Sequence, residues 1–100
     1  FMKLEILDLA RSDLIEGYRF YESHEEGLGD YFLDTLFSDI ESLRIHGGVH
    51  RKVYRNLHRA LSKRFPFAIY YSVESETVRV QSVVDCRRNP SWIRRHLRDG

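Results

Sequence analysis

Basic side chains in the second half of the sequence are the residues whose types and spacing could do chemistry. They are Arg55, Arg59, Lys63, Arg64, Arg87, Arg88, Arg94, Arg95 and Arg98. If the strands that carry them are neighbours, these groups gather at one end of a sheet, where they suit phosphates or carboxylates. The pattern favours the binding of an acidic partner or of a nucleic-acid backbone. The alternative is a solvated basic surface that acidic helices balance.

The net charge of the whole chain hides this basic cluster. A formal net charge of +1 over 100 residues would by itself exclude a strongly basic nucleic-acid binder. However, residues 1–46 hold four basic and eleven acidic side chains, a net charge of −7, whereas residues 47–100 hold twelve and four, a net charge of +8. The chain therefore joins an acidic half to a basic half, unless the split only reflects the acidic solvated faces of helices.

Other kinds of site find little support in the sequence. The histidines show no paired spacing of the zinc-binding kind; they are His24, His46, His50, His58 and His96. No glycine-rich loop has the pattern that cradles phosphates. Cys86 could be a nucleophile whose pKa the following arginines lower, but a half-buried residue at the end of a strand is the simpler interpretation. We expect neither a metal nor a cofactor.

Length and composition predict a single small domain over residues 1–100, with Phe1 an addition ahead of a native start at Met2. A chain of 100 residues that is 42% apolar can build one modest core. The longest apolar run, residues 67–71, is far shorter than the roughly 18 residues that span a bilayer. No secretory leader opens the chain, and one cysteine cannot form an internal disulfide. These features predict a cytoplasmic protein.

Changes in hydrophobic period predict the elements that position the basic cluster. Periodicity predicts a strand at Met2–Leu7 and helices over about Leu9–Ser23 and Leu28–Ile45, with Asp8 as the N-cap of the first helix. A period of two then predicts three strands and a final helix. They cover Tyr54–Ser62, residues 67–73, residues 77–84 and Trp92–Arg98.

The predicted fold class is α+β, with a helix hairpin on one face of a mostly antiparallel four-stranded sheet. The element order is β-α-α-β-β-β followed by a short C-terminal helix. In the last strand, simple alternation places four side chains on each face. Val78, Val80, Ser82 and Val84 share one face, and Thr77, Arg79, Gln81 and Val83 share the other.

Three segments carry a resemblance to a known family. The helix hairpin contains residues 10–14 (ARSDL), then Tyr18 and Tyr21, then residues 27–33 (GLGDYFL). The strands contain Arg59 and residues 64–73 (RFPFAIYYSV), and the C-terminal part contains residues 87–92 (RRNPSW). In this order they resemble the RelE/ParE toxins of type II toxin–antitoxin systems, whose usual ending is Arg-Asp-Pro. The resemblance covers nearly the whole chain.

The resemblance implies two modes of action. RelE-like members are ribosome-dependent mRNA endonucleases, in which positive charge stabilises the scissile phosphate and a Tyr, His or Glu transfers protons. In this chain Arg59, Arg64 and Arg87 would hold the phosphate, with His58 or His96 in proton transfer.

This sequence departs from the nuclease pattern at three positions. Such nucleases usually carry an arginine where this chain has Ala68, a tyrosine near Trp92 and a histidine where it has Asp85. The departures favour the ParE-like branch, which poisons DNA gyrase and for which the resemblance implies no catalytic site.

The resemblance therefore implies a growth-inhibiting toxin of a plasmid-stabilisation or stress-response module. A cognate antitoxin would wrap the domain, with apolar anchors on the sheet or in helix grooves and acidic residues over the basic cluster. A degenerate, non-toxic binding module is a further alternative. We expect contacts with the target or the antitoxin at Arg59, Lys63, Arg64, Arg87, Arg88 and Trp92.

Overall fold

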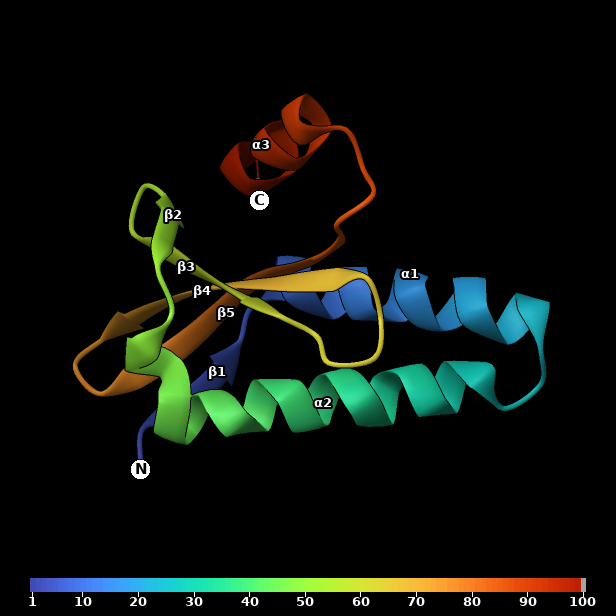
Figure 1. The fold of residues 1–100 in the computed structure, drawn as a ribbon, viewed down its shortest axis with the longest axis horizontal. Helices are drawn as coiled ribbons and strands as arrows, with labels where there is room; N and C mark the ends of the chain where they lie inside the picture. Colours follow the sequence, from blue (N-terminus) through green and yellow to red (C-terminus); the bar gives the residue numbers. More distant parts are fainter. Residues whose placement is uncertain (100) are drawn as a thin grey trace.

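The computed structural model describes residues 1–99 and has the expected α+β architecture (Figure 1). Gly100, the last residue of the expected domain, lies outside the described residues. A short 3-10 turn at Gly47–Val49 joins the second helix to the second strand. The other elements are β1 (Lys3–Ile6), α1 (Asp8–His24), α2 (Leu28–His46), β2 (Lys52–Tyr54), β3 (Leu57–Leu61), β4 (Phe67–Glu74), β5 (Thr77–Asp85) and α3 (Pro90–Asp99).

The two long helices form the predicted hairpin, and each begins and ends within one residue of its predicted range. The expected N-cap is wrong by one position, because Asp8 is the first helical residue and Leu7 precedes it. The start of α2 has a cap that periodicity did not predict. The Glu22 carboxylate accepts hydrogen bonds from the backbone N–H groups of Gly27 (3.1 Å) and Gly29 (2.9 Å), which satisfies donors that a helix N-terminus leaves free.

The sheet has five strands in the order β1-β5-β4-β3-β2, one more than predicted. β1 pairs with β5 in parallel, and the other pairs are antiparallel. The expected single strand Tyr54–Ser62 is instead the hairpin of β2 and β3. Its turn contains Arg55 at a φ of 52°, a left-handed conformation that glycine usually signals, so no residue type marked a break there.

A bulge in β5 overturns the simple alternation predicted for that strand. Tyr71 pairs with Val80, but Tyr70 pairs with Ser82, so Gln81 is an extra residue. Beyond the bulge the faces exchange. Val83 joins the core under the helices, and Val84 joins the core on the opposite face.

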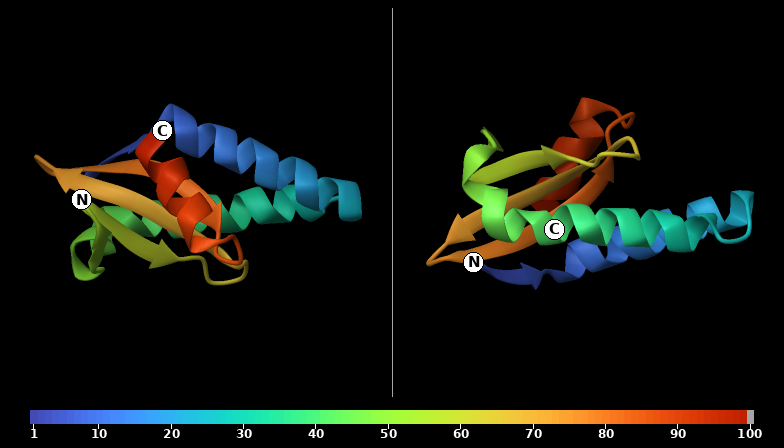
Figure 2. Two further views of the ribbon diagram at one scale, coloured as in Figure 1. Left: turned by 90° about the horizontal axis from the view of Figure 1, so that it is seen from above. Right: turned by 60° about the horizontal axis from the view of Figure 1, so that its bottom comes forward.

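The sheet lies between two layers of helix (Figures 1 and 2). α1 and α2 cover one face, where the larger core includes Phe32, Leu36, Ile69 and Val80. α3 crosses the opposite face, where Leu97 packs with a smaller core. The other buried members of that core are Leu57, Ala68, Tyr70 and Val84. No helix within residues 1–99 is long and apolar enough to cross a membrane.

Two buried carboxylates attach the helices to the sheet. Asp13 of α1, which is 7% exposed, accepts hydrogen bonds from the Ser82 hydroxyl (2.5 Å) and the Val83 N–H (2.9 Å). Asp39 of α2 accepts one from the Ser62 hydroxyl (2.6 Å) at the end of β3. Both aspartates are buried at helix positions where the amphipathic spacing predicts an apolar side chain.

Gly17 permits the close approach of the two long helices. A methyl group at this position would lie 2.5 Å from Cζ of Phe32, a side chain that is fully buried. We expect Gly17→Ala to lower the free energy of unfolding by about 1–3 kcal/mol, because overpacking outweighs the better helix propensity of alanine. Urea denaturation measures this change.

Gly48→Ala is the matched control, because nothing lies within 4 Å of a methyl group placed there. If Gly17→Ala were as stable as the wild type, the two helices could accommodate the methyl group with no loss of unfolding free energy.

Candidate functional site

A cleft between α3 and the adjacent face of the sheet gathers part of the predicted basic cluster. Arg59 of β3, Arg88 of the β5–α3 connection and Arg94 of α3 line this cleft, which has a volume of about 300 Å³. We call it the arginine cleft. The rest of its lining is mainly apolar or aromatic: Val53, Tyr54, Tyr70, Cys86, Pro90, Ile93 and Leu97.

Strand pairing and the start of α3 produce this arrangement. Arg59 lies directly opposite Tyr70 in the β3–β4 pair, so both side chains emerge on the face that α3 covers. Asn89 then turns the chain back over that face. Its side-chain oxygen accepts hydrogen bonds from the backbone N–H of Ser91 (2.8 Å) and from the Ser91 hydroxyl (2.6 Å). α3 therefore begins at Pro90, two residues before the predicted start at Trp92.

The guanidinium groups of the arginine cleft have no acidic partner among the described residues. Within residues 1–99, the arginines that form ion pairs are Arg44, Arg79, Arg87 and Arg98. Arg59, Arg88 and Arg94 are exposed and remain available. Guanidiniums of this kind beside an apolar floor can bind a carboxylate or phosphate through charge-assisted hydrogen bonds.

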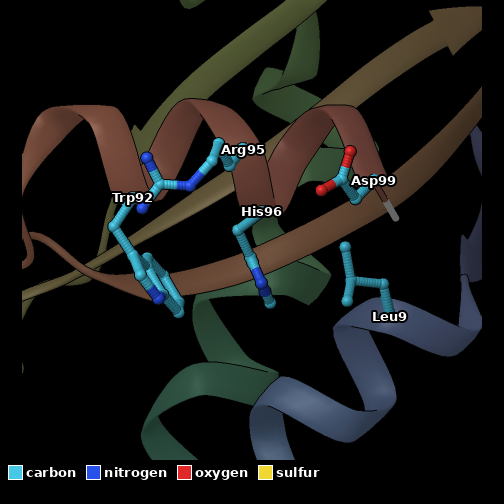
Figure 3. Close-up of a pocket in the computed structure, with 5 residues that line it drawn as sticks. All are labelled: Leu9, Trp92, Arg95, His96 and Asp99. Carbon is cyan, nitrogen blue, oxygen red and sulfur yellow. The ribbon is translucent and has the colours of Figure 1, made fainter.

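Trp92 does not line the arginine cleft, but it forms the centre of a column of stacked side chains that includes Arg88 of the cleft. The Arg88 guanidinium lies 4.0 Å from the centre of the indole ring. On α3 the ring of His96 stacks on Trp92 with centroids 4.6 Å apart (Figure 3). His96 Nε2 then donates a hydrogen bond to Asp13 Oδ1 at 2.7 Å. Trp92 is therefore half-buried and holds Arg88 in place, in addition to any contact with a partner.

The other members of the predicted cluster lie elsewhere, so the structure divides the expected single patch. Arg87 makes two side-chain hydrogen bonds to Asp85, at 2.9 and 2.7 Å. These bonds hold the pKa of Asp85 below its ordinary value. Arg64 donates a hydrogen bond to the Tyr31 hydroxyl of α2 at 3.1 Å. Lys63 has an exposed side chain in the β3–β4 connection and does not line the cleft.

The two histidines considered for proton transfer do not line the arginine cleft either. His58 stacks on Tyr71, whose ring lies in the core under the long helices, so it points away from Arg59. Its Nδ1 donates to the backbone oxygen of His50 at 2.7 Å. Burial raises the pKa of Tyr71 to about 12. His96 uses its Nε2 on Asp13. The geometry expected of a nuclease centre is therefore not assembled.

Cys86 directly follows β5 and lines the cleft. The residue as a whole is exposed to solvent. Burial of its thiol raises the pKa above the ordinary value, while the positive charge of Arg59 acts in the opposite direction. A thiol with a raised pKa is a poor nucleophile at neutral pH. This agrees with the interpretation of Cys86 as a strand-end residue.

Two aromatic residues that line the cleft, Tyr54 and Tyr70, were not among the predicted site residues. Alternation along residues 67–73 does place Tyr70 on the face opposite Ile69 and Tyr71, but nothing in the sequence pairs it with Arg59. The hairpin turn at Arg55, which brings Tyr54 opposite Leu57, was also not predicted.

Comparison with known proteins bears on the fold. No protein-family model matches the sequence, and no curated protein matches it. A solved structure described as the chromosomal ParDE TA system from P. aeruginosa contains a chain that is similar to this one. The TM-score is 0.70 at 14% identity, over 84% of this chain and 95% of that chain.

The fold is RelE/ParE-like. The chain also matches a mutant of the E. coli toxin RelE in the free state, with a TM-score of 0.48 at 13% identity over 98% of this chain and 95% of that one. A chain of the intact E. coli RelBE toxin–antitoxin complex matches with a TM-score of 0.46 at 18% identity, over 88% of this chain and 100% of that one. The likeness to the P. aeruginosa chain confirms the fold that the resemblance implied.

The position of Arg59 beside Cys86 predicts a measurable effect on the thiol. Arg59→Gln keeps most of the side-chain volume but removes the positive charge, so we expect it to raise the pKa of Cys86 further. The pH profile of Cys86 alkylation by iodoacetamide should then move to higher pH.

Arg64→Gln is the matched control, because Arg64 contacts α2 and not the cleft. Equal pH profiles for the Arg59→Gln and Arg64→Gln proteins would contradict the proximity of Arg59 to Cys86.

Proposed function

We propose that this chain is the toxin component of a bacterial type II toxin–antitoxin module that acts in the cytoplasm. It stops growth by binding an essential target, DNA gyrase, and a cognate antitoxin keeps it silent. The observation that carries the proposal is the arginine cleft on a RelE/ParE-like fold. Within residues 1–99, its three guanidinium groups form no ion pair with an acidic side chain. They are therefore free to bind an anionic partner.

The gyrase target is favoured over mRNA cleavage by the arrangement of the basic side chains. Cleavage by the residues considered above would require Arg59, Arg64 and Arg87 around one phosphate, with a histidine beside it. Arg64 instead contacts α2, and Arg87 is bound to Asp85. His58 points to the opposite side of the sheet from Arg59. Ala68, where the nucleases of this family usually have an arginine, lies in the core under α3.

An antitoxin segment has two complementary surfaces to occupy. Its acidic side chains would lie over the arginine cleft, with Arg59, Arg88 and Trp92 as principal contacts. Its apolar side chains would enter a groove of about 640 Å³ between β1 and the two long helices. In that groove Ile15 and Phe37 are about half exposed, at 50% and 45%. Such exposure leaves apolar area for a partner to bury.

Induced expression of the chain in bacteria tests the proposal. We expect growth to stop with induction of the DNA-damage response, while bulk mRNA stays intact. Rapid loss of translating mRNA would contradict the gyrase target and support the endonuclease alternative. Unimpaired growth at a normal protein level would contradict any toxic function and leave a binding module.

The Arg59→Ala/Arg88→Ala double variant links the activity to the cleft. We expect it to relieve growth arrest or weaken antitoxin binding, because each lost charged hydrogen bond is worth roughly 1.5–3 kcal/mol. Arg19→Ala, which removes an exposed arginine on α1, is the control and should behave as the wild type. If the double variant kept full toxicity and full antitoxin affinity, neither property would depend on the arginine cleft.

A further inference from the structure

Apart from the contacts of Arg88 and Asn89, which directly precede the helix, one side-chain hydrogen bond joins α3 to the rest of the described chain. It joins His96 Nε2 to Asp13 Oδ1 at 2.7 Å. Within residues 1–99 the other side-chain hydrogen bonds of α3 are local: Ser91 binds the preceding Asn89, and Arg98 binds the neighbouring Asp99. Beyond these neighbouring residues, α3 is fixed in place by Asp13 of α1 and by its apolar contacts.

The protons at this contact can be assigned from the acceptors. The Asp13 carboxylate already accepts from Ser82 and Val83 at Oδ2. An ionised carboxylate donates no proton, so the proton shared with Oδ1 resides on His96 Nε2. The side chain of Asp13 is 7% exposed, and that of His96 is 21% exposed. Both partners are therefore largely shielded from water while α3 is in place.

The apolar contacts of α3 are few for a helix that covers a core. It has ten residues, of which Leu97 is the buried one, with Trp92 and Ile93 half-buried. Isolated helices of this length are marginal in water. Exposed arginines on the same helix, Arg94 and Arg95, add charge but form no ion pair within residues 1–99. α3 therefore belongs to the part of the molecule that can open locally.

α3 covers an apolar strip of the sheet beside the arginine cleft. The strip consists of Leu57, Ala68, Tyr70 and Val84, all less than a tenth exposed while α3 is in place. Arg59 lies at its border, opposite Tyr70. Movement of α3 would expose this strip and alter the cleft at the same time, since Arg94 moves with the helix.

We propose that α3 is a latched lid and that the His96–Asp13 hydrogen bond is its latch. The latch holds α3 closed over the apolar strip, and its release opens α3 without unfolding the α1–α2 hairpin or the sheet. The hairpin and sheet stay joined because Ser82 and Val83 remain bound to Asp13 when His96 leaves. This device does not depend on which target the chain binds.

Native-state hydrogen exchange of the full chain tests the latch. His96→Phe keeps a ring against Trp92 but removes the donor, so α3 amides should exchange roughly 10- to 100-fold faster. Amides of β4 and α2 should keep their protection. His96→Gln retains an N–H donor near the position of Nε2, and we expect it to restore most of the protection of α3. Arg98→Gln, on the same helix, is the control.

Trp92, the single tryptophan, gives an independent readout. In His96→Phe its fluorescence should become more accessible to acrylamide, whereas in His96→Gln and Arg98→Gln it should match the wild type. Unchanged exchange of α3 amides in His96→Phe would overturn the latch. Equal acceleration of the α3, β4 and α2 amides would overturn the claim that α3 opens separately.

Discussion

The structure depends on a buried carboxylate, that of Asp13. β1 pairs with β5 only as far as Val80, so the next part of β5 has no neighbouring strand on that side within residues 1–99. Asp13 takes the place of a strand there, because its Oδ2 accepts the Val83 N–H and the Ser82 hydroxyl. Its Oδ1 accepts from His96 of α3. One side chain of α1 thus joins the hairpin, the sheet and the terminal helix, and these hydrogen bonds together compensate its burial.

The bulge at Gln81 and the carboxylate of Asp13 act together on the arginine cleft. The bulge turns Val84 toward α3 and Val83 toward the long helices, so both faces of β5 are apolar where each is covered. α3 then packs on Val84, and His96 fixes it to Asp13. This placement brings Arg88 over Trp92 and sets Arg94 across from Arg59. The acidic hairpin therefore positions the basic surface through a buried contact, although the two halves of the chain carry opposite net charges.

Much of the fold could be predicted from the sequence, and the failures have physical reasons. The α1 and α2 ranges follow from apolar spacing because long amphipathic helices repeat their signal over many turns. The β2–β3 hairpin was missed because a non-glycine residue, Arg55, adopts the left-handed conformation in its turn. The bulge was missed because it depends on partners from β4. Within the site, Arg59 and Arg88 come together as expected, but Asp85 and Tyr31 hold Arg87 and Arg64 apart from them. A contact between one pair of side chains produces no periodic pattern in the sequence, so it could not be predicted in this way.

The most direct measurement is the free energy of unfolding of Asp13→Asn in urea, with Glu16→Gln on the exposed face of the same helix as the reference. An amide at position 13 offers one acceptor oxygen to three donors and turns its own N–H₂ toward at least one of them. We predict a loss of roughly 3 kcal/mol or more for Asp13→Asn, because buried donors are left without acceptors. A change within about 0.5 kcal/mol, as for a surface substitution, would contradict the central role of this carboxylate.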